Sequence, residues 1–113
     1  GPKNIRKLQD PNRIGNLYIW DTGNGATFKV GFTIENQARE GVRRKYPGGH
    51  QVLFVKGITQ QQEWGIHEGL SKLYPSPKNE IYETVVGELC ITVGMLLDAC
   101  QKPIPKLQIV RRA

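Results

Sequence analysis

Two short segments near the N-terminus carry a phenol and an amine at positions from which they could act on one substrate. Tyr18 lies in NLYIW and Lys29 lies in TFKVGFT, and the two segments are joined by DTGNG. The Asn24-Gly25 pair in this joint favours the positive φ angles that a hairpin turn needs. The sequence therefore predicts two antiparallel strands that bring the phenol and the amine to one edge of a sheet.

Positive charge is concentrated directly after these two segments. Four basic residues fall within seven positions, namely Arg39, Arg43, Arg44 and Lys45. In a helix, Arg39 and Arg43 lie one turn apart on the same face. Most charge runs are solvated surface, but this one follows the strand that carries Lys29, so three cations can converge. Converging cations suit phosphate groups.

An acid and a histidine also share one face of a predicted helix. Glu63 and His67 are four residues apart in QQQEWGIHEGLSKLY, whose apolar residues recur broadly at helical spacing. Taken alone, the pair is better explained as a surface acid beside a partly buried histidine. A catalytic or metal-binding interpretation needs support from elsewhere in the chain.

The composition points to a polyanionic partner. The chain has 113 residues, with 16 Lys and Arg against 10 Asp and Glu, a net charge of +6 and a pI near 9.6. This length suits a single domain that buries about two thirds of the surface its unfolded chain exposes. A basic domain of this kind fits a nucleic-acid partner, provided that the charge gathers on one surface.

Several other classes of site are excluded by their patterns. The glycine-rich stretch GNGATFKVG lacks the Gly-Lys-Ser/Thr ending of a phosphate-binding P-loop and lies between two strands, so it is interpreted as a hairpin turn. No pair of cysteines or histidines has the spacing of a zinc site, and no serine lies in a nucleophile elbow.

The cysteines and the hydropathy bear on the compartment. Cys90 and Cys100 are ten residues apart in one predicted helix, which places them about 15 Å apart along its axis, too far for a disulfide. The sequence contains neither a signal peptide nor an apolar run of membrane-spanning length. We therefore expect reduced, buried thiols in an intracellular protein, cytoplasmic or nuclear, with no membrane partner.

The rest of the pattern predicts the elements that position these side chains. A helix capped by Thr33 or Asn36 is expected to run to the residue before Pro47. QVLFVKGI, residues 51–58, is the strongest strand and is expected at the centre of the sheet. The other predicted elements are a helix over 60–74, a short strand over 80–84 and a closing helix over 85–101.

The chain divides into three predicted regions. Residues 1–14 are expected to be a tag remnant and an N-terminal tail or linker, because the leading Gly-Pro resembles a protease-cleavage scar. Residues 15–101 form the predicted domain, and residues 102–113, which contain two prolines, form a C-terminal tail or linker. The domain is expected to be one module of a larger protein.

Taken in order, these motifs resemble those of the GIY-YIG nuclease family. The chain has LYI, a turn, KVG and an arginine ten residues after Lys29. It is most similar to the branch whose YKIG motif has lysine in place of the second tyrosine. The resemblance covers roughly Gly15 to Gln101 and is supported by the pattern E..IH..L, which ends at Leu70. It implies a small α/β domain in which a three-stranded antiparallel sheet is flanked by helices.

The resemblance also implies a role for each matching residue. The implied catalytic residues are Tyr18, Lys29, Arg39 and Glu63, with Glu63 as the ligand of Mg²⁺ or Mn²⁺. The predicted nucleic-acid-binding residues are Arg43, Arg44, Lys45, His50, His67 and Asn79. The implied reaction is metal-dependent endonucleolytic hydrolysis of phosphodiester bonds in DNA, with RNA left open, and Arg39 is expected to hold the scissile phosphate.

Two questions stay open in the sequence. A phenol is a poor base unless nearby cations lower its pKa, as Lys29 and Arg39 are expected to do for Tyr18; a neutral Lys29 is the alternative base. The domain could also bind nucleic acid without cutting it, or bind proteins while its basic face is incidental. The endonuclease interpretation requires Tyr18, Lys29, Arg39 and Glu63 to face one groove.

Overall fold

The computed structural model describes residues 10–101 as a small α/β domain. Residues 1–9 of the predicted N-terminal tail and the whole predicted C-terminal tail, 102–113, lie outside the described residues. The elements are β1 (Ile14–Asp21), β2 (Thr27–Thr33), α2 (Glu40–Lys45), β3 (His50–Thr59), α3 (Gln60–Leu73), β4 (Ile81–Glu83) and α4 (Val86–Gln101).

The sheet is antiparallel and contains four strands in the order β3-β1-β2-β4. The predicted count of three strands is therefore wrong, because the short strand β4 pairs with β2 and extends the sheet by one member. The predicted central place of β3 is also wrong, since β3 is an edge strand and β1 and β2 lie at the centre. Although β3 is at the edge, its apolar residues pack against the clusters on both faces of the sheet.

The predicted hairpin of β1 and β2 is confirmed. Asp21 holds its turn closed, because its Oδ1 accepts hydrogen bonds from the backbone N–H groups of Gly23 and Gly25 at 2.8 and 3.2 Å. The register pairs Tyr18 with Gly31 and Trp20 with Lys29. Directly opposed residues share a face of the sheet, so the phenol and the amine leave β1 and β2 on the same side.

The basic helix α2 is shorter than predicted. It begins at Glu40 with Arg39 as its N-cap, so the expected caps Thr33 and Asn36 and the shared helical face of Arg39 and Arg43 are wrong. The preceding segment is held elsewhere: the backbone N–H of Ala38 donates to the side chain of Gln51 on β3 at 2.8 Å. This bond and the full burial of Ala38 keep the segment out of the helix.

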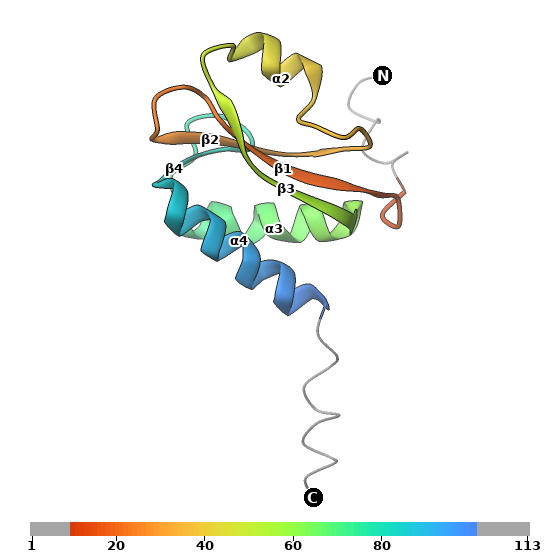
Figure 1. Cartoon of the computed structure of the whole chain (residues 1–113). Coiled ribbons are helices and arrows are strands. Elements are labelled where there is room, and N and C mark those ends of the chain that lie inside the picture. Colours follow the sequence, from red (N-terminus) through yellow and green to blue (C-terminus); the bar gives the residue numbers. More distant parts are fainter. Residues whose placement is uncertain (1–9, 102–113) are drawn as a thin grey trace, which may run out of the picture.

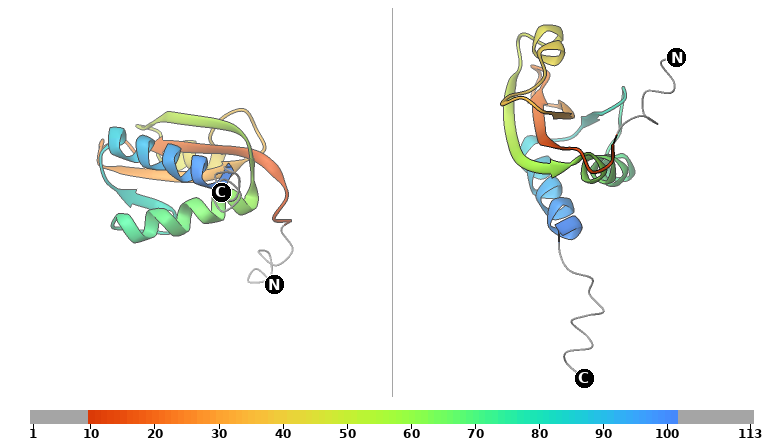
Figure 2. Two further views of the ribbon diagram at one scale, coloured as in Figure 1. Left: turned by 90° about the horizontal axis from the view of Figure 1, so that it is seen from below. Right: turned by 90° about the vertical axis from the view of Figure 1, so that its right-hand side faces the viewer.

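The helices cover both faces of the sheet. Figure 1 shows α2 on one face and α3 and α4 on the other. Figure 2 shows α4 running across the sheet and α3 lying alongside α4 at the margin of the sheet, and the two helices contact each other where Gly69 gives room to Leu96. The main core lies between this face and the two helices, and a smaller apolar cluster of Tyr18, Trp20 and Ala38 lies beneath α2.

The helix α3 carries the predicted acid and histidine, and it ends one residue before the predicted range of 60–74 does. Thr59 and Gln62 form a reciprocal capping box at its N-terminus. Its buried residues Ile66 and Leu70 belong to the main core. This packing fixes the rotation of the helix about its axis, so Glu63 and His67 are held toward the edge of the sheet near β4.

Two further expectations concern membranes and thiols. Within residues 10–101, no helix has the length and the apolar character needed to cross a bilayer. Cys90 and Cys100 are both free. The expectation of buried thiols is wrong for Cys100, which is exposed near the end of α4, whereas Cys90 is partly buried.

Candidate metal and phosphate site

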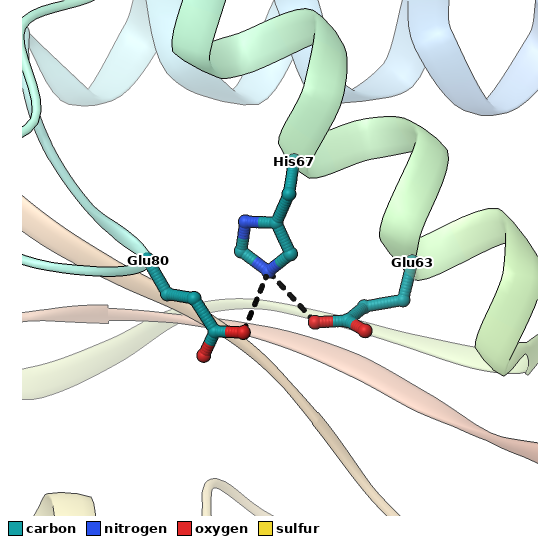
Figure 3. A group of neighbouring side chains, drawn as sticks. All are labelled: Glu63, His67 and Glu80. Atoms are coloured by element: carbon teal, nitrogen blue, oxygen red, sulfur yellow. Dashed lines mark hydrogen bonds and ion pairs between the residues drawn. The ribbon is translucent and has the colours of Figure 1, made fainter. Parts of the chain in front are cut away.

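Three side chains from different parts of the chain meet beside α3. Glu63 and His67 come from this helix, and Glu80 comes from the turn before β4; Figure 3 shows both carboxylates directed at the same ring nitrogen. His67 Nε2 lies 2.7 Å from Glu63 Oε2 and 3.6 Å from Glu80 Oε2. One donor atom from each residue lies within 4.8 Å of the other two, so the cluster can hold a metal ion.

The helical pair of this cluster is fixed by neighbouring polar groups. The Glu63 side chain is 4 % exposed, and its Oε1 accepts a 2.6 Å hydrogen bond from the side-chain amide of Gln60. His67 Nδ1 lies 2.6 Å from the hydroxyl of Tyr82 on β4, and the two rings stack with centroids 5.8 Å apart. Burial and nearby acids raise the pKa of Tyr82 to about 12, so this phenol stays protonated at neutral pH.

Glu80 is the residue of this cluster that the sequence did not reveal. Its φ is +64°, in the left-handed region that non-glycine residues seldom adopt, and its carbonyl accepts a hydrogen bond from the N–H of Val30 at 2.9 Å. The turn thereby directs its carboxylate toward both His67 and Lys29. Lys29 Nζ lies 2.7 Å from Glu80 Oε1, so the predicted catalytic lysine forms an ion pair with the acid cluster.

A groove runs past the cluster and consists of three adjoining hollows. The largest, about 730 Å³, includes Arg39 and Glu63; the second, about 540 Å³, includes Tyr18, Lys29 and Arg39; the third, about 440 Å³, includes His67. Asn79 and Glu80 border all three hollows. Of the four predicted catalytic residues, Tyr18, Lys29 and Arg39 share one hollow and Glu63 lines the adjoining one, which Arg39 also borders.

Tyr18 lies at the floor of this groove in a state that differs from the one expected. Burial raises its pKa to about 12, an effect that the nearby charge of Arg39 only partly offsets. The expectation that cations lower the pKa of this phenol is therefore wrong, because desolvation is the larger effect. Gly31 makes room for the ring across the strand pair, since a Cβ at this position would overlap the phenol.

The other predicted nucleic-acid-binding residues fall into two groups. Lys45 and Asn79 line the groove together with Tyr18, and His67 lines it beside Tyr82. The residues that line none of these hollows are Arg43, Arg44 and His50. Arg43 donates from Nε to the carbonyl of Ala38, and exposed Arg44 lies 3.4 Å from Glu40.

Two cations in the groove were missed by the sequence analysis. Lys78 lines the hollow that contains Tyr18, and Arg13 lines the hollow that contains Glu63, with its guanidinium 5.7 Å from the centre of the Phe32 ring. Arg13 belongs to the segment predicted as tail, where no periodicity marks it, although its carbonyl accepts a hydrogen bond from Gln60 at the start of α3. The three hollows are therefore lined by five cations, Arg13, Lys29, Arg39, Lys45 and Lys78, and by five acids, Glu35, Glu40, Glu63, Glu68 and Glu80. The positive charge is concentrated in the hollow that contains Tyr18, where four of the cations meet only Glu80.

The resemblance to GIY-YIG nucleases rests on these residues and their spacing, since no protein-family model, curated protein or solved structure matches the chain.

Proposed function

We propose that this domain is a divalent-metal-dependent endonuclease of the GIY-YIG type that hydrolyses phosphodiester bonds in DNA, with RNA as the alternative substrate. The observation that carries the proposal is the contact between two unlike sites in one groove. The acid cluster of Glu63, His67 and Glu80 adjoins a hollow lined by Lys29 and Arg39. A phosphodiester bound to such cations lies beside the cluster.

Each part of the groove has a separate task in this proposal. A divalent ion held by the cluster would supply Lewis-acid stabilisation of the phosphoryl oxygens and favour ionisation of the attacking water. Arg39 lies at the junction of the two larger hollows and can donate paired hydrogen bonds to the scissile phosphate. Lys45 and Lys78 extend the positive surface for the neighbouring phosphates.

Tyr18 acts as a hydrogen-bond donor in this proposal. With a pKa raised to about 12, the phenol keeps its proton at neutral pH and can donate to a phosphoryl oxygen. Lys29 is held as a counter-ion of Glu80 at 2.7 Å, an arrangement that suits an ammonium group. Neither side chain therefore has the surroundings of a general base.

A second function, nucleic-acid binding without cleavage, is favoured by the pairing inside the cluster. The two oxygens of Glu63 already contact Gln60 and His67, and Glu80 already contacts Lys29. These contacts satisfy both carboxylates without a metal ion. The groove would then bind phosphates through its cations alone.

Nicking of supercoiled plasmid with Mg²⁺ or Mn²⁺ tests the proposal. We expect the wild-type domain to nick the plasmid only when a divalent ion is added, and Glu63→Gln to lower the rate by at least about 10²-fold, because a hard divalent ion binds weakly without its carboxylate. Binding of DNA to Glu63→Gln, measured by fluorescence anisotropy, should be unchanged or tighter, since a negative charge beside the phosphates is removed.

The matched control is Glu88→Gln, which removes an acid from the first turn of α4, outside the groove. This variant should nick and bind like the wild type. Wild-type protein that binds DNA but leaves the plasmid intact with every divalent ion would instead establish the binding module.

A further inference from the structure

The second histidine of the chain gives the acid cluster a mixed donor set. His67 Nε2 lies between the two carboxylates, 2.7 Å from an oxygen of Glu63 and 3.6 Å from an oxygen of Glu80. Ligands on adjacent positions of one small divalent ion lie roughly 3 Å apart, because each is about 2.1 Å from the ion. An ion that contacts both carboxylates here therefore also meets the imidazole nitrogen.

From this donor set, we infer that the Glu63-His67-Glu80 cluster selects a first-row transition ion, such as Mn²⁺ or Zn²⁺, over Mg²⁺. Mg²⁺ is a hard ion that prefers oxygen ligands and retains its waters, whereas imidazole nitrogen suits the transition ions. A site built from carboxylates alone would not discriminate in this way. The inference identifies the metal of the proposed endonuclease. It rests on that proposed function only for the role of the ion in catalysis, and not for the binding of the ion.

The hydrogen bond to Tyr82 is the second observation that points to a ligand at Nε2. Tyr82 lies 2.6 Å from Nδ1 and stacks on the ring at an interplanar angle of 24°. A metal-binding histidine commonly contacts a polar group through its other ring nitrogen, which fixes the orientation of the ring. Tyr82 is thus a positioning residue that keeps Nε2 directed at Glu63 and Glu80.

The cluster is shielded from solvent on the side of α3 and accessible to solvent on the side of Glu80. The side chains of Glu63 and His67 are 4 % and 14 % exposed, whereas Glu80, on its turn, is 26 % exposed and borders the groove. Three protein ligands leave positions for water or phosphate on the groove side. A transition ion would therefore be held on one side by the ligands of α3 and would remain accessible to a substrate from the groove.

Competition between ions tests the inference without any cleavage. The probe is Mn²⁺ added to wild-type protein, with the free ion measured by its paramagnetic resonance signal while Mg²⁺ is titrated in. We expect Mn²⁺ to bind at least about tenfold more tightly than Mg²⁺, and Zn²⁺, measured by calorimetry, to bind more tightly again. Displacement of Mn²⁺ by an equal concentration of Mg²⁺ would overturn the inference.

Variants then assign the selectivity to the ring nitrogen. His67→Gln should lower the affinity for Mn²⁺ and Zn²⁺ by at least about tenfold while changing that for Mg²⁺ by less than about threefold, because only the transition ions gain from imidazole. The matched control is His50→Gln, which removes the exposed histidine at the start of β3. Equal affinities of wild type and His67→Gln for Mn²⁺ would contradict the assignment.

A milder variant keeps the inference testable even if His67→Gln does not fold. Tyr82→Phe leaves the ring stack and the nitrogen in place and removes only the hydroxyl, so it should weaken Mn²⁺ binding by about 10- to 100-fold, as expected for a group that orients a ligand. Protein that selects Mn²⁺ but never cuts DNA keeps this inference and removes the endonuclease. Protein that cuts DNA but binds Mg²⁺ as tightly as Mn²⁺ keeps the endonuclease and overturns the inference.

Discussion

Tyr18 lines the groove beside Lys29 and Arg39, yet its surroundings do not suit a general base. Its side chain is almost fully buried, and burial raises its pKa to about 12 although Arg39 lies close enough to lower it. The charged form of a phenol loses more from desolvation than it gains from one exposed guanidinium. In the proposed endonuclease the hydroxyl is therefore a hydrogen-bond donor, and it keeps its proton throughout the neutral pH range.

The pH dependence of cleavage tests this role. Tyr18→Phe should lower the rate by about 10- to 100-fold, because one hydrogen bond to the developing charge is lost, while the melting temperature stays nearly constant. With its pKa raised to about 12, the wild-type phenol stays protonated over the whole pH range of the assay. The ratio of the wild-type rate to the variant rate should therefore be constant from about pH 6 to 9. A ratio that rises tenfold with each pH unit would restore Tyr18 as the base.

The residues of the site differ in how well the sequence predicts them. Glu63 and Arg39 could be found because each stands at a fixed distance from a recognisable motif. Glu80 could not, because its place depends on a left-handed backbone conformation and on pairing with a strand 51 residues earlier in the chain. The pKa of Tyr18 was also beyond the sequence, since burial of the hydroxyl depends on the close fit of the ring over Gly31.

At the scale of the elements, local patterns predicted which strands and helices form, and longer-range contacts decided how they are arranged. The hairpin of β1 and β2 follows from turn residues that lie next to each other in the chain. The strand order does not, because the apolar residues of β3 pack on both faces without revealing that its outer edge lacks a partner within residues 10–101. The start of α2 likewise depends on a bond from Ala38 to Gln51.

The close fit between β1 and β2 gives a stability prediction. Gly31→Ala should lower the free energy of unfolding by about 1–3 kcal/mol, because the added Cβ would overlap the buried ring of Tyr18 and force it to move. Gly41→Ala is the matched control: it lies inside α2 with open space around a Cβ, so it should raise stability by roughly 0.5–1 kcal/mol. Chemical denaturation measures both, and equal effects of the two changes would contradict the packing argument.

At the scale of the whole molecule, the net charge of +6 matters less than its place. The groove gathers cations that are far apart in the sequence, from Arg13 to Lys78, together with five acids, and its positive charge is concentrated in the hollow that contains Tyr18. The exposed face of α2 holds Arg44 outside this groove. If the domain binds nucleic acid as proposed, the nucleic acid would follow the groove or cross α2, and the two paths involve different residues.

The salt dependence of DNA binding distinguishes these two paths. Each phosphate contact contributes about −0.9 to the slope of log K against log salt concentration, so Lys78→Ala should make the slope less steep by about one unit if DNA follows the groove. Arg44→Ala removes the same charge from α2 and should change the slope far less. The reverse order, measured by anisotropy across a salt series, would place the DNA on α2, as the sequence alone predicted.

The ion pair of Lys29 with Glu80 would couple the binding of the proposed phosphate to the binding of the proposed metal ion. Lys29 lines the hollow that contains Tyr18, where we propose that phosphate binds, and Glu80 belongs to the candidate metal cluster; the two side chains form an ion pair at 2.7 Å. An anion that draws Lys29 toward itself leaves Glu80 free for a cation, and by linkage the cation raises the affinity for the anion by the same factor. The two ligands would then bind cooperatively across a single salt bridge, without any change of fold.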